Sequence, residues 1–199
     1  YLTFALYDYL HNKLKKKPKV LGIELRSELV EKCNAIVEKA KFDHLSFEQG
    51  AIKEVVLPKI DVLMALHACD IATDDAIARG IKDQAKVILA APCCHKQIRN
   101  SMKNQGSLAA LTKFGIMEAR QAEILTDSIR ALILESYGYK TKVFEFIATD
   151  HTPKNILIAA VKTKEIELPD PIIKEQITTL KETFGISFHE LERLMEIKN

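Results

Sequence analysis

The stretch DVLMALHACD spans residues 61–70, and the stretch KVILAAPCCH spans residues 86–95. Each opens with an apolar run, Asp61–Leu66 in the first and Lys86–Ala91 in the second, and such runs are typical of buried parallel strands. Histidine, cysteine and aspartate follow the first run, and proline, two cysteines and histidine follow the second. Because ligands bind outside the carboxyl ends of the strands in open α/β sheets, we expect the chemistry at these two ends.

Strands and helices alternate along the rest of the chain. Apolar spacing predicts strands at residues 20–25, 45–52, 61–66 and 86–91, and a closing hairpin at 142–148 and 155–162. It predicts helices at 2–12, 27–41, 73–79 and 118–137, and two more in the tail at 172–183 and 187–197. Ser27 and Ser187 are expected to cap their helices, and Gly80 and Gly138 to end theirs. The sequence therefore predicts an α/β fold, with a Rossmann-like, doubly wound, mostly parallel sheet, a C-terminal antiparallel hairpin and a helical tail.

Composition narrows the class of protein. The 199 residues carry a net charge of +2 and are 47% hydrophobic, as is ordinary for a globular protein. No apolar stretch approaches the roughly 20 residues of a membrane span, so no membrane partner is expected. Four cysteines, two of them adjacent, do not indicate a secreted disulfide framework, and we expect a cytoplasmic location. The chain starts at Tyr1 inside a predicted helix, so we expect a fragment of a longer protein.

Two motifs carry a resemblance to a known family. Ala65–Asp70 (ALHACD) and Ala91–Lys96 (APCCHK) resemble a methyltransferase-like family of class I S-adenosylmethionine-dependent methyltransferases. This family includes stand-alone microbial proteins and the glutathione S-transferase C-terminal-domain-containing protein of animals. Tyr1–Leu6 is similar to the segment that follows the family's Gly-rich cofactor loop, and His151–Asn155 is also similar to a family segment.

The resemblance covers about residues 1–163 and implies a domain organisation. We expect a methyltransferase domain over residues 1–165, without its first strand and Gly-rich loop, and a C-terminal helical extension over residues 166–199. Because glycines let the backbone approach the cofactor closely, we expect this polypeptide alone to bind the cofactor poorly.

The cofactor implied by the resemblance is S-adenosylmethionine. Glu24 closes a predicted strand at a position where an acid accepts hydrogen bonds from both ribose hydroxyls. The alternative role for Glu24 is that of an exposed carboxylate favoured at a helix start. The remaining cofactor contacts are expected at other strand ends, from Leu25, Gln49, Gly50, Ala51 and Leu66.

The methyl acceptor is expected beside the ends of the two stretches quoted first. The side chains expected to shape its pocket are His67, Cys69, Asp70, Pro92 and Cys93. His67 or Asp70 would orient an amine or hydroxyl, although Asp70 also suits a helix N-cap.

Two alternatives for the cysteines stay open. His67, Cys69, Cys93, Cys94 and His95 could converge on a soft metal ion, although their spacing matches ordinary zinc knuckles poorly. Alternatively, cysteines at two neighbouring strand ends resemble those of RNA cytosine-5 methyltransferases, in which a thiolate attacks the base. We expect neither a metal nor a covalent intermediate, because electrophilic methyl transfer depends mainly on proximity and alignment.

The predicted function is S-adenosylmethionine-dependent methyl transfer. Substrate contacts are expected from the hairpin turn, through His151, Lys154 and Asn155. RNA is slightly favoured over protein as acceptor, because a basic run (KLKKKPK, 13–19) and Lys96, Arg99 and Lys103 can contact phosphates. The alternative is a degenerate methyltransferase fold that acts as a non-enzymatic binding module. The apolar C-terminal helices predict either internal packing or a homodimer contact.

Overall fold

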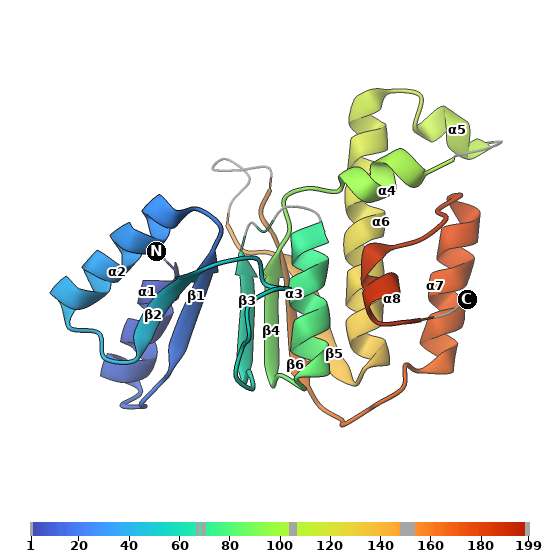
Figure 1. Cartoon of the computed structure of the whole chain (residues 1–199). Coiled ribbons are helices and arrows are strands. Elements are labelled where there is room, and N and C mark those ends of the chain that lie inside the picture. Colours follow the sequence, from blue (N-terminus) through green and yellow to red (C-terminus); the bar gives the residue numbers. More distant parts are fainter. Residues whose placement is uncertain (1, 67, 69–70, 104–106, 148–153, 198–199) are drawn as a thin grey trace. The chain divides into compact units, whose positions relative to one another are not determined.

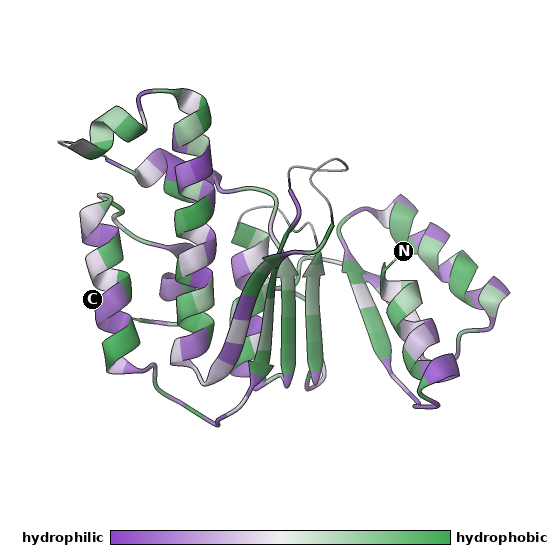
Figure 2. Cartoon of the chain, turned by 180° about the vertical axis from the view of Figure 1, so that it is seen from behind, coloured by the Kyte–Doolittle hydropathy of each residue, from purple (hydrophilic) through white to green (hydrophobic). Residues whose placement is uncertain are grey.

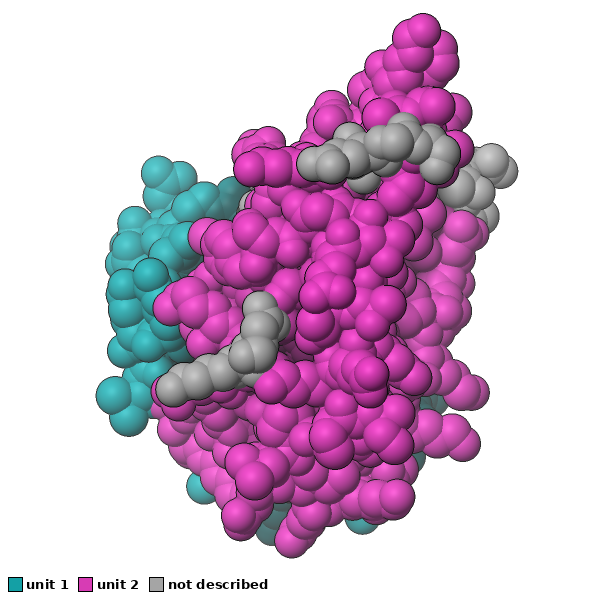
Figure 3. Space-filling model, turned by 90° about the vertical axis from the view of Figure 1, so that its right-hand side faces the viewer, with its two compact units in different colours: residues 1–56 teal, residues 57–199 magenta. Residues whose placement is uncertain are grey.

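The computed structural model describes residues 2–66, 68, 71–103, 107–147 and 154–197. The chain divides into two compact units, residues 1–56 and residues 57–199 (Figure 3). Each unit has its own sheet, and each is considered by itself.

Unit 1 is a small parallel α/β unit. Its elements are α1 (Leu2–Asp8), the π-helix η1 (Tyr9–Lys13), β1 (Val20–Glu24), α2 (Ser27–Ala40) and β2 (Leu45–Gln49) (Figure 1). The two strands are parallel and in register from Val20 opposite Leu45 to Glu24 opposite Gln49. The carboxyl ends of β1 and β2 therefore lie side by side.

Aromatic side chains form the core of unit 1. The ring of Phe4 lies 5.3 Å from that of Phe47, and Tyr7 lies 4.8 Å from Phe42. Tyr7 is buried, and its hydroxyl donates to the carbonyl of Asp43 at 2.5 Å. These contacts hold α1 against the turn that leads into β2.

Unit 2 contains a mixed four-stranded sheet and most of the helices. Its elements are β3 (Val62–Leu66), α3 (Ile71–Lys82), β4 (Val87–Ala91), α4 (Lys96–Ser101), α5 (Ser107–Leu111), α6 (Gly115–Ser136), β5 (Tyr139–Glu145), β6 (Ile156–Lys162), α7 (Pro171–Thr183) and α8 (Glu190–Leu194). The strand order is β3-β4-β6-β5. β3 and β4 are parallel, and β6 is antiparallel to β4 and to β5. The predicted α/β fold with parallel strands and a closing antiparallel hairpin is confirmed.

Helices α3 and α6 pack on one face of this sheet, where Ile77, Ile88, Ile129 and Ile158 are fully buried (Figure 1). Figure 2 shows the sheet of unit 2 from behind, and its strands are coloured mostly as hydrophobic residues. At the rim of the sheet Val62 is 45% exposed and Val161 is 51% exposed.

Several predicted helix boundaries were wrong. Gly80 does not end α3 but lies inside it. A Cβ at this position would come within 2.8 Å of Ile88 Cδ1. Glycine therefore allows the helix to approach β4 closely. Ser27 is the first residue of α2 rather than its cap, since the extended backbone of Arg26 occupies the cap position. The apolar side of α2 is only partly shielded, and Ile36 is 42% exposed.

The C-terminal tail packs within unit 2. α7 lies against α6, and α8 lies against α3 and α6. His189, not Ser187, caps α8, because its Nδ1 accepts a hydrogen bond from the Leu191 amide at 3.1 Å. Leu191 is fully buried and Phe188 is 46% exposed, so part of the predicted apolar pattern is internal packing. A dimer contact through these helices stays a prediction.

Across the described ranges, we find no helix that is both long enough and apolar enough to cross a membrane.

Candidate functional site

The carboxyl edge of unit 1 brings together the cofactor residues predicted there. Glu24 and Gln49 are register partners at the ends of β1 and β2. The amide of Gly50 donates to the carbonyl of Glu24 at 3.1 Å, and Gln49 Nε2 donates to the carbonyl of Leu25 at 3.1 Å. These bonds bind the two strand ends together and leave the Leu25 side chain 67% exposed.

Glu24 presents a carboxylate at this edge. It accepts hydrogen bonds from Arg26 Nε at 3.0 Å and Arg26 Nη2 at 3.2 Å. The hydrogen bonds from Arg26 lower the pKa of Glu24 below its ordinary value, so the group is an acceptor at neutral pH. Because the Arg26 side chain is 71% exposed, a ligand hydroxyl can replace it at little cost.

Packing explains the glycine at position 50, which was also predicted to contact the cofactor. A Cβ at Gly50 would lie 2.6 Å from Val55 Cγ2. The carbonyl of Ala51 accepts from the amides of Glu54 and Val55, at 2.9 and 3.1 Å. The turn after β2 is therefore folded back on itself by local bonds.

The carboxyl edge of unit 2 carries the two sequence motifs. Leu66 and Ala91 are register partners at the ends of β3 and β4. Pro92 is buried, whereas Cys93 and Cys94 are partly exposed, and their Sγ atoms are 3.7 Å apart. His67, Cys69 and Asp70, which were predicted to shape the acceptor pocket, lie outside the described residues, as does His151 of the hairpin turn.

A buried network of polar and charged side chains lies next to this edge. His95 Nε2 lies 3.2 Å from Asp127 Oδ2, and Asp127 Oδ1 accepts from Arg130 Nη1 at 3.1 Å. Arg130, which is fully buried, also donates two hydrogen bonds to Asp74, at 2.8 and 3.1 Å. Burial raises the pKa of the Asp74 carboxyl, and the Arg130 guanidinium acts against that rise. This network thus links the segment after β4 to α6 and to the first turns of α3.

The start of β6 lies at the same edge, because β6 runs antiparallel to β4. Lys154 donates to Glu123 of α6 at 3.0 Å. Asn155 is buried, and its Nδ2 donates to the carbonyl of Ile147 at 2.8 Å across the hairpin. Asn155 therefore closes the hairpin, and its predicted contact with the substrate stays a prediction.

The sequence did not single out Asp127, Arg130 and Glu123. All three lie in the buried stripe of α6, among Ile129, Ile133 and other apolar residues. Their spacing places these charged residues within the apolar side of the helix. Because charged residues are almost never buried unless paired, this pattern could have predicted a buried ion pair.

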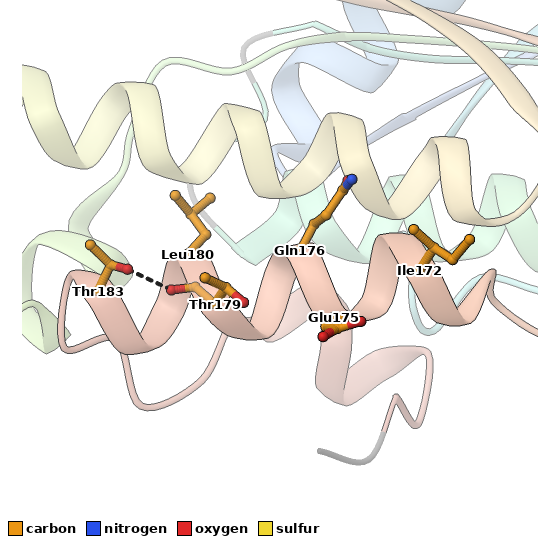
Figure 4. Close-up of a pocket in the computed structure, with 6 residues that line it drawn as sticks. All are labelled: Ile172, Glu175, Gln176, Thr179, Leu180 and Thr183. Carbon is orange, nitrogen blue, oxygen red and sulfur yellow. Dashed lines mark hydrogen bonds between the residues drawn. The ribbon is translucent and has the colours of Figure 1, made fainter.

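Two grooves are found among the described residues. A groove of about 460 Å³ between α6 and the β5–β6 pair is mostly apolar, and Glu123 and Asp127 are among the residues that line it. A second groove of about 460 Å³ runs along α7, where Gln176 and Leu180 point toward α6 (Figure 4). The second groove contains none of the predicted site residues, so we assign it to helix packing.

The predicted site residues fall into two groups, one in each unit. Glu24, Leu25, Gln49, Gly50 and Ala51 share the edge of unit 1. Leu66, Pro92, Cys93, Lys154 and Asn155 share the edge of unit 2. Within the part of the chain that the structure describes, no group of three or more His, Cys, Asp or Glu side chains could hold a metal ion.

Comparison with solved structures gave matches at low identity. The citrinin polyketide synthase CMeT domain is 14% identical, with a TM-score of 0.42 over 81% of this chain and 43% of that one. WbdD is 14% identical, with a TM-score of 0.43 over 81% and 39% of the two chains. A SAM-dependent methyltransferase from Aquifex aeolicus is 13% identical, with a TM-score of 0.34 over 76% and 72%. The chain thus spans less than half the length of the first two structures.

A comparison with curated proteins gave no match. A family model described as "Methyltransferase domain" matches residues 1–101. The matched segment is more than half of the 199 residues, and it includes β1, β2 and the strand-end motifs of β3 and β4. The chain therefore belongs to this methyltransferase-domain family.

Proposed function

We propose that the protein transfers a methyl group from S-adenosylmethionine to an acceptor held at the carboxyl ends of its strands. The observation that carries this proposal is the pairing of Glu24 with Gln49 at the ends of β1 and β2, where Arg26 lowers the pKa of the Glu24 carboxyl below its ordinary value. A charged acceptor of hydrogen bonds at this position suits the two hydroxyls of a ribose.

The residues of unit 1 fit the nucleoside part of the cofactor. Glu24 would accept from the ribose hydroxyls in place of Arg26. Gln49, Gly50 and Ala51 would contact the adenine through backbone and apolar groups, and the exposed Leu25 would cover one side of it. When bound, S-adenosylmethionine supplies an electrophilic methyl group on a sulfonium.

Each of the two sheets has an outer strand whose second edge has no strand paired with it among the described residues. Among the described residues, β1 pairs only with β2, and β3 pairs only with β4. We propose that a strand and Gly-rich loop of the kind that the family resemblance implies complete the cofactor site. Full affinity for the cofactor is then expected only of a protein that contains this segment.

The edge of unit 2 would hold the acceptor. Leu66 would complete the cofactor side of this edge, and His67, Cys69, Asp70, Pro92 and Cys93 would line the acceptor pocket. Buried Pro92 and the bond between His95 and Asp127 fix the segment that follows β4. Fixed geometry matters here because alignment supplies much of the rate of methyl transfer.

RNA is the proposed acceptor, ahead of protein side chains. Lys96, the first residue of α4, and Lys103, which follows that helix, are exposed, while Arg99 pairs with Glu118 at 2.9 Å. The basic run at residues 13–19 precedes β1, so it lies at the opposite end of that strand from Glu24. Lys96 and Lys103 therefore support an RNA contact at this edge, and the basic run does not.

The experiment is methyl transfer from tritium-labelled S-adenosylmethionine by the full-length protein into fractionated cell extract. Label in the RNA fraction is expected. Label in the protein fraction would overturn RNA as acceptor and keep the reaction. Bound cofactor without label in any fraction would indicate the alternative, a methyltransferase fold that serves as a binding module.

A further inference from the structure

Cys93 and Cys94 form a pair of neighbouring thiols directly after β4. Their Sγ atoms are 3.7 Å apart, and both side chains are partly exposed. The pair lies on the edge of unit 2, so reagents and ions in solution can reach it.

The residues on both sides hold this pair in place. Pro92 before it and His95 after it are buried, and His95 is bonded to Asp127. Asp127 is in turn held by Arg130. The buried neighbours hold the backbone on both sides of the pair, and the two sulfur atoms approach each other as hydrogen-bond partners. A ligand bound by both sulfur atoms therefore needs little rearrangement of the backbone.

We propose that Cys93 and Cys94 bind one thiophilic divalent cation of the Zn²⁺ or Cd²⁺ type through two thiolates, as a property separate from methyl transfer, for which no metal is expected. Zn–S bonds of about 2.3 Å in a tetrahedron place two sulfur ligands about 3.8 Å apart. The observed separation of 3.7 Å matches this edge of the tetrahedron. Each thiol loses its proton to solvent when its sulfur binds the cation, and no oxidation or reduction takes place.

The same distance argues against a disulfide as the function of the pair. A disulfide needs sulfur atoms about 2.05 Å apart and Cα atoms usually about 4.4–6.8 Å apart, whereas neighbouring residues have Cα atoms about 3.8 Å apart. Cation binding leaves the sulfur atoms near their present positions. The proposal assigns only the two thiolates of Cys93 and Cys94 to the cation, and the remaining coordination positions of a tetrahedral site are left unassigned.

Cadmium titration of the full chain under a phosphine reductant tests the proposal without any methyl acceptor. We expect a cadmium–thiolate absorption band that saturates at one equivalent. Peptide mapping after alkylation should show Cys93 and Cys94 protected together by cadmium. Cys93→Ser and Cys94→Ser should each weaken binding by roughly tenfold or more, since even outer-shell changes cost about 10- to 100-fold.

Cys33→Ser is the matched control, because Cys33 is a partly exposed cysteine of α2 in the other unit, and it should keep the affinity unchanged. Equal alkylation of Cys93 and Cys94 with and without cadmium would overturn the proposal, and this measurement uses the unaltered chain. A one-equivalent band that survives in the Cys93→Ser/Cys94→Ser variant would overturn it as well.

Discussion

Arg130 has no exposed surface, yet it carries a charge that two buried carboxylates balance. Arg130→Met leaves Asp74 and Asp127 without their shared cation. We expect the free energy of unfolding to fall by about 3–5 kcal/mol, as for other broken buried pairs. Urea denaturation measures this loss.

Arg99→Met is the matched control for that prediction. Arg99 also pairs with a carboxylate at 2.9 Å, but its side chain is 45% exposed and that of Glu118 is 37% exposed. A surface pair contributes at most about 1 kcal/mol. Equal losses in the two variants would show that Asp74 and Asp127 do not need Arg130.

His189 makes stability depend on pH. Burial, with Arg130 and Lys181 adding to it, lowers the pKa of His189 from 6.5 to about 3. As the pH falls from 6.5 toward 3, the unfolded chain binds a proton at this residue and the folded chain does not. The part of the free energy of unfolding that depends on His189 is therefore fully present above pH 6.5. It is lost as the pH falls from 6.5 toward 3, by about 1.4 kcal/mol per pH unit for one proton.

His189→Asn should flatten this slope, because asparagine can still cap α8 and does not titrate. His44→Asn is the control, since His44 is exposed with a φ of +70°, which asparagine tolerates. The measurement is the denaturation midpoint of each variant between about pH 4 and about pH 7, a range that contains the ordinary pKa of histidine. A slope in His189→Asn equal to that of the unaltered protein would refute the assignment.

At the scale of elements, Gly138 decides how α6 passes into β5. Its φ is +82°, and a Cβ there would lie 2.5 Å from the carbonyl oxygen of Lys164. Gly138→Ala should lower the free energy of unfolding by more than about 1 kcal/mol, because of the left-handed backbone and the clash. Gly115→Ala, at the other end of α6, meets only Arg99 at 3.6 Å and should change stability by less than about 0.5 kcal/mol. Thermal unfolding of both variants would contradict this account if the two losses were alike.

The strands were predictable from the sequence because each has a local signal. The apolar runs of β1, β3 and β4 and the terminator Gly138 are visible in the chain itself. Gly80 and Ser27 misled the prediction, because their roles depend on contacts with Ile88 and on the backbone of Arg26. Such contacts join residues that are distant in sequence or depend on a backbone angle, and residue type alone does not report either.

At the scale of the whole molecule, the alternation of strands and helices predicted the α/β class. It did not predict the network of Asp74, Arg130, Asp127 and His95, which joins α3, α6 and the segment after β4 through side chains up to 56 residues apart. The strand-end residues of the candidate site were predictable because topology alone places carboxyl ends of parallel strands together. The side chains that fix these strand ends, those of Asp127, Arg130 and Asp74, were not predictable, because the partners of buried charges are set by packing.

The central claim is that S-adenosylmethionine binds at the carboxyl end of β1 through Glu24. Calorimetry of S-adenosylmethionine binding to the full-length protein tests it most directly, with Glu24→Ala as the variant. Glu28→Ala is the control, because Glu28 is an exposed acid at the start of α2, the alternative role for Glu24. We predict that Glu24→Ala weakens binding by about tenfold or more, as expected for a lost charged hydrogen-bond acceptor, and that Glu28→Ala leaves it unchanged. Equal affinity in Glu24→Ala and the unaltered protein would contradict the claim.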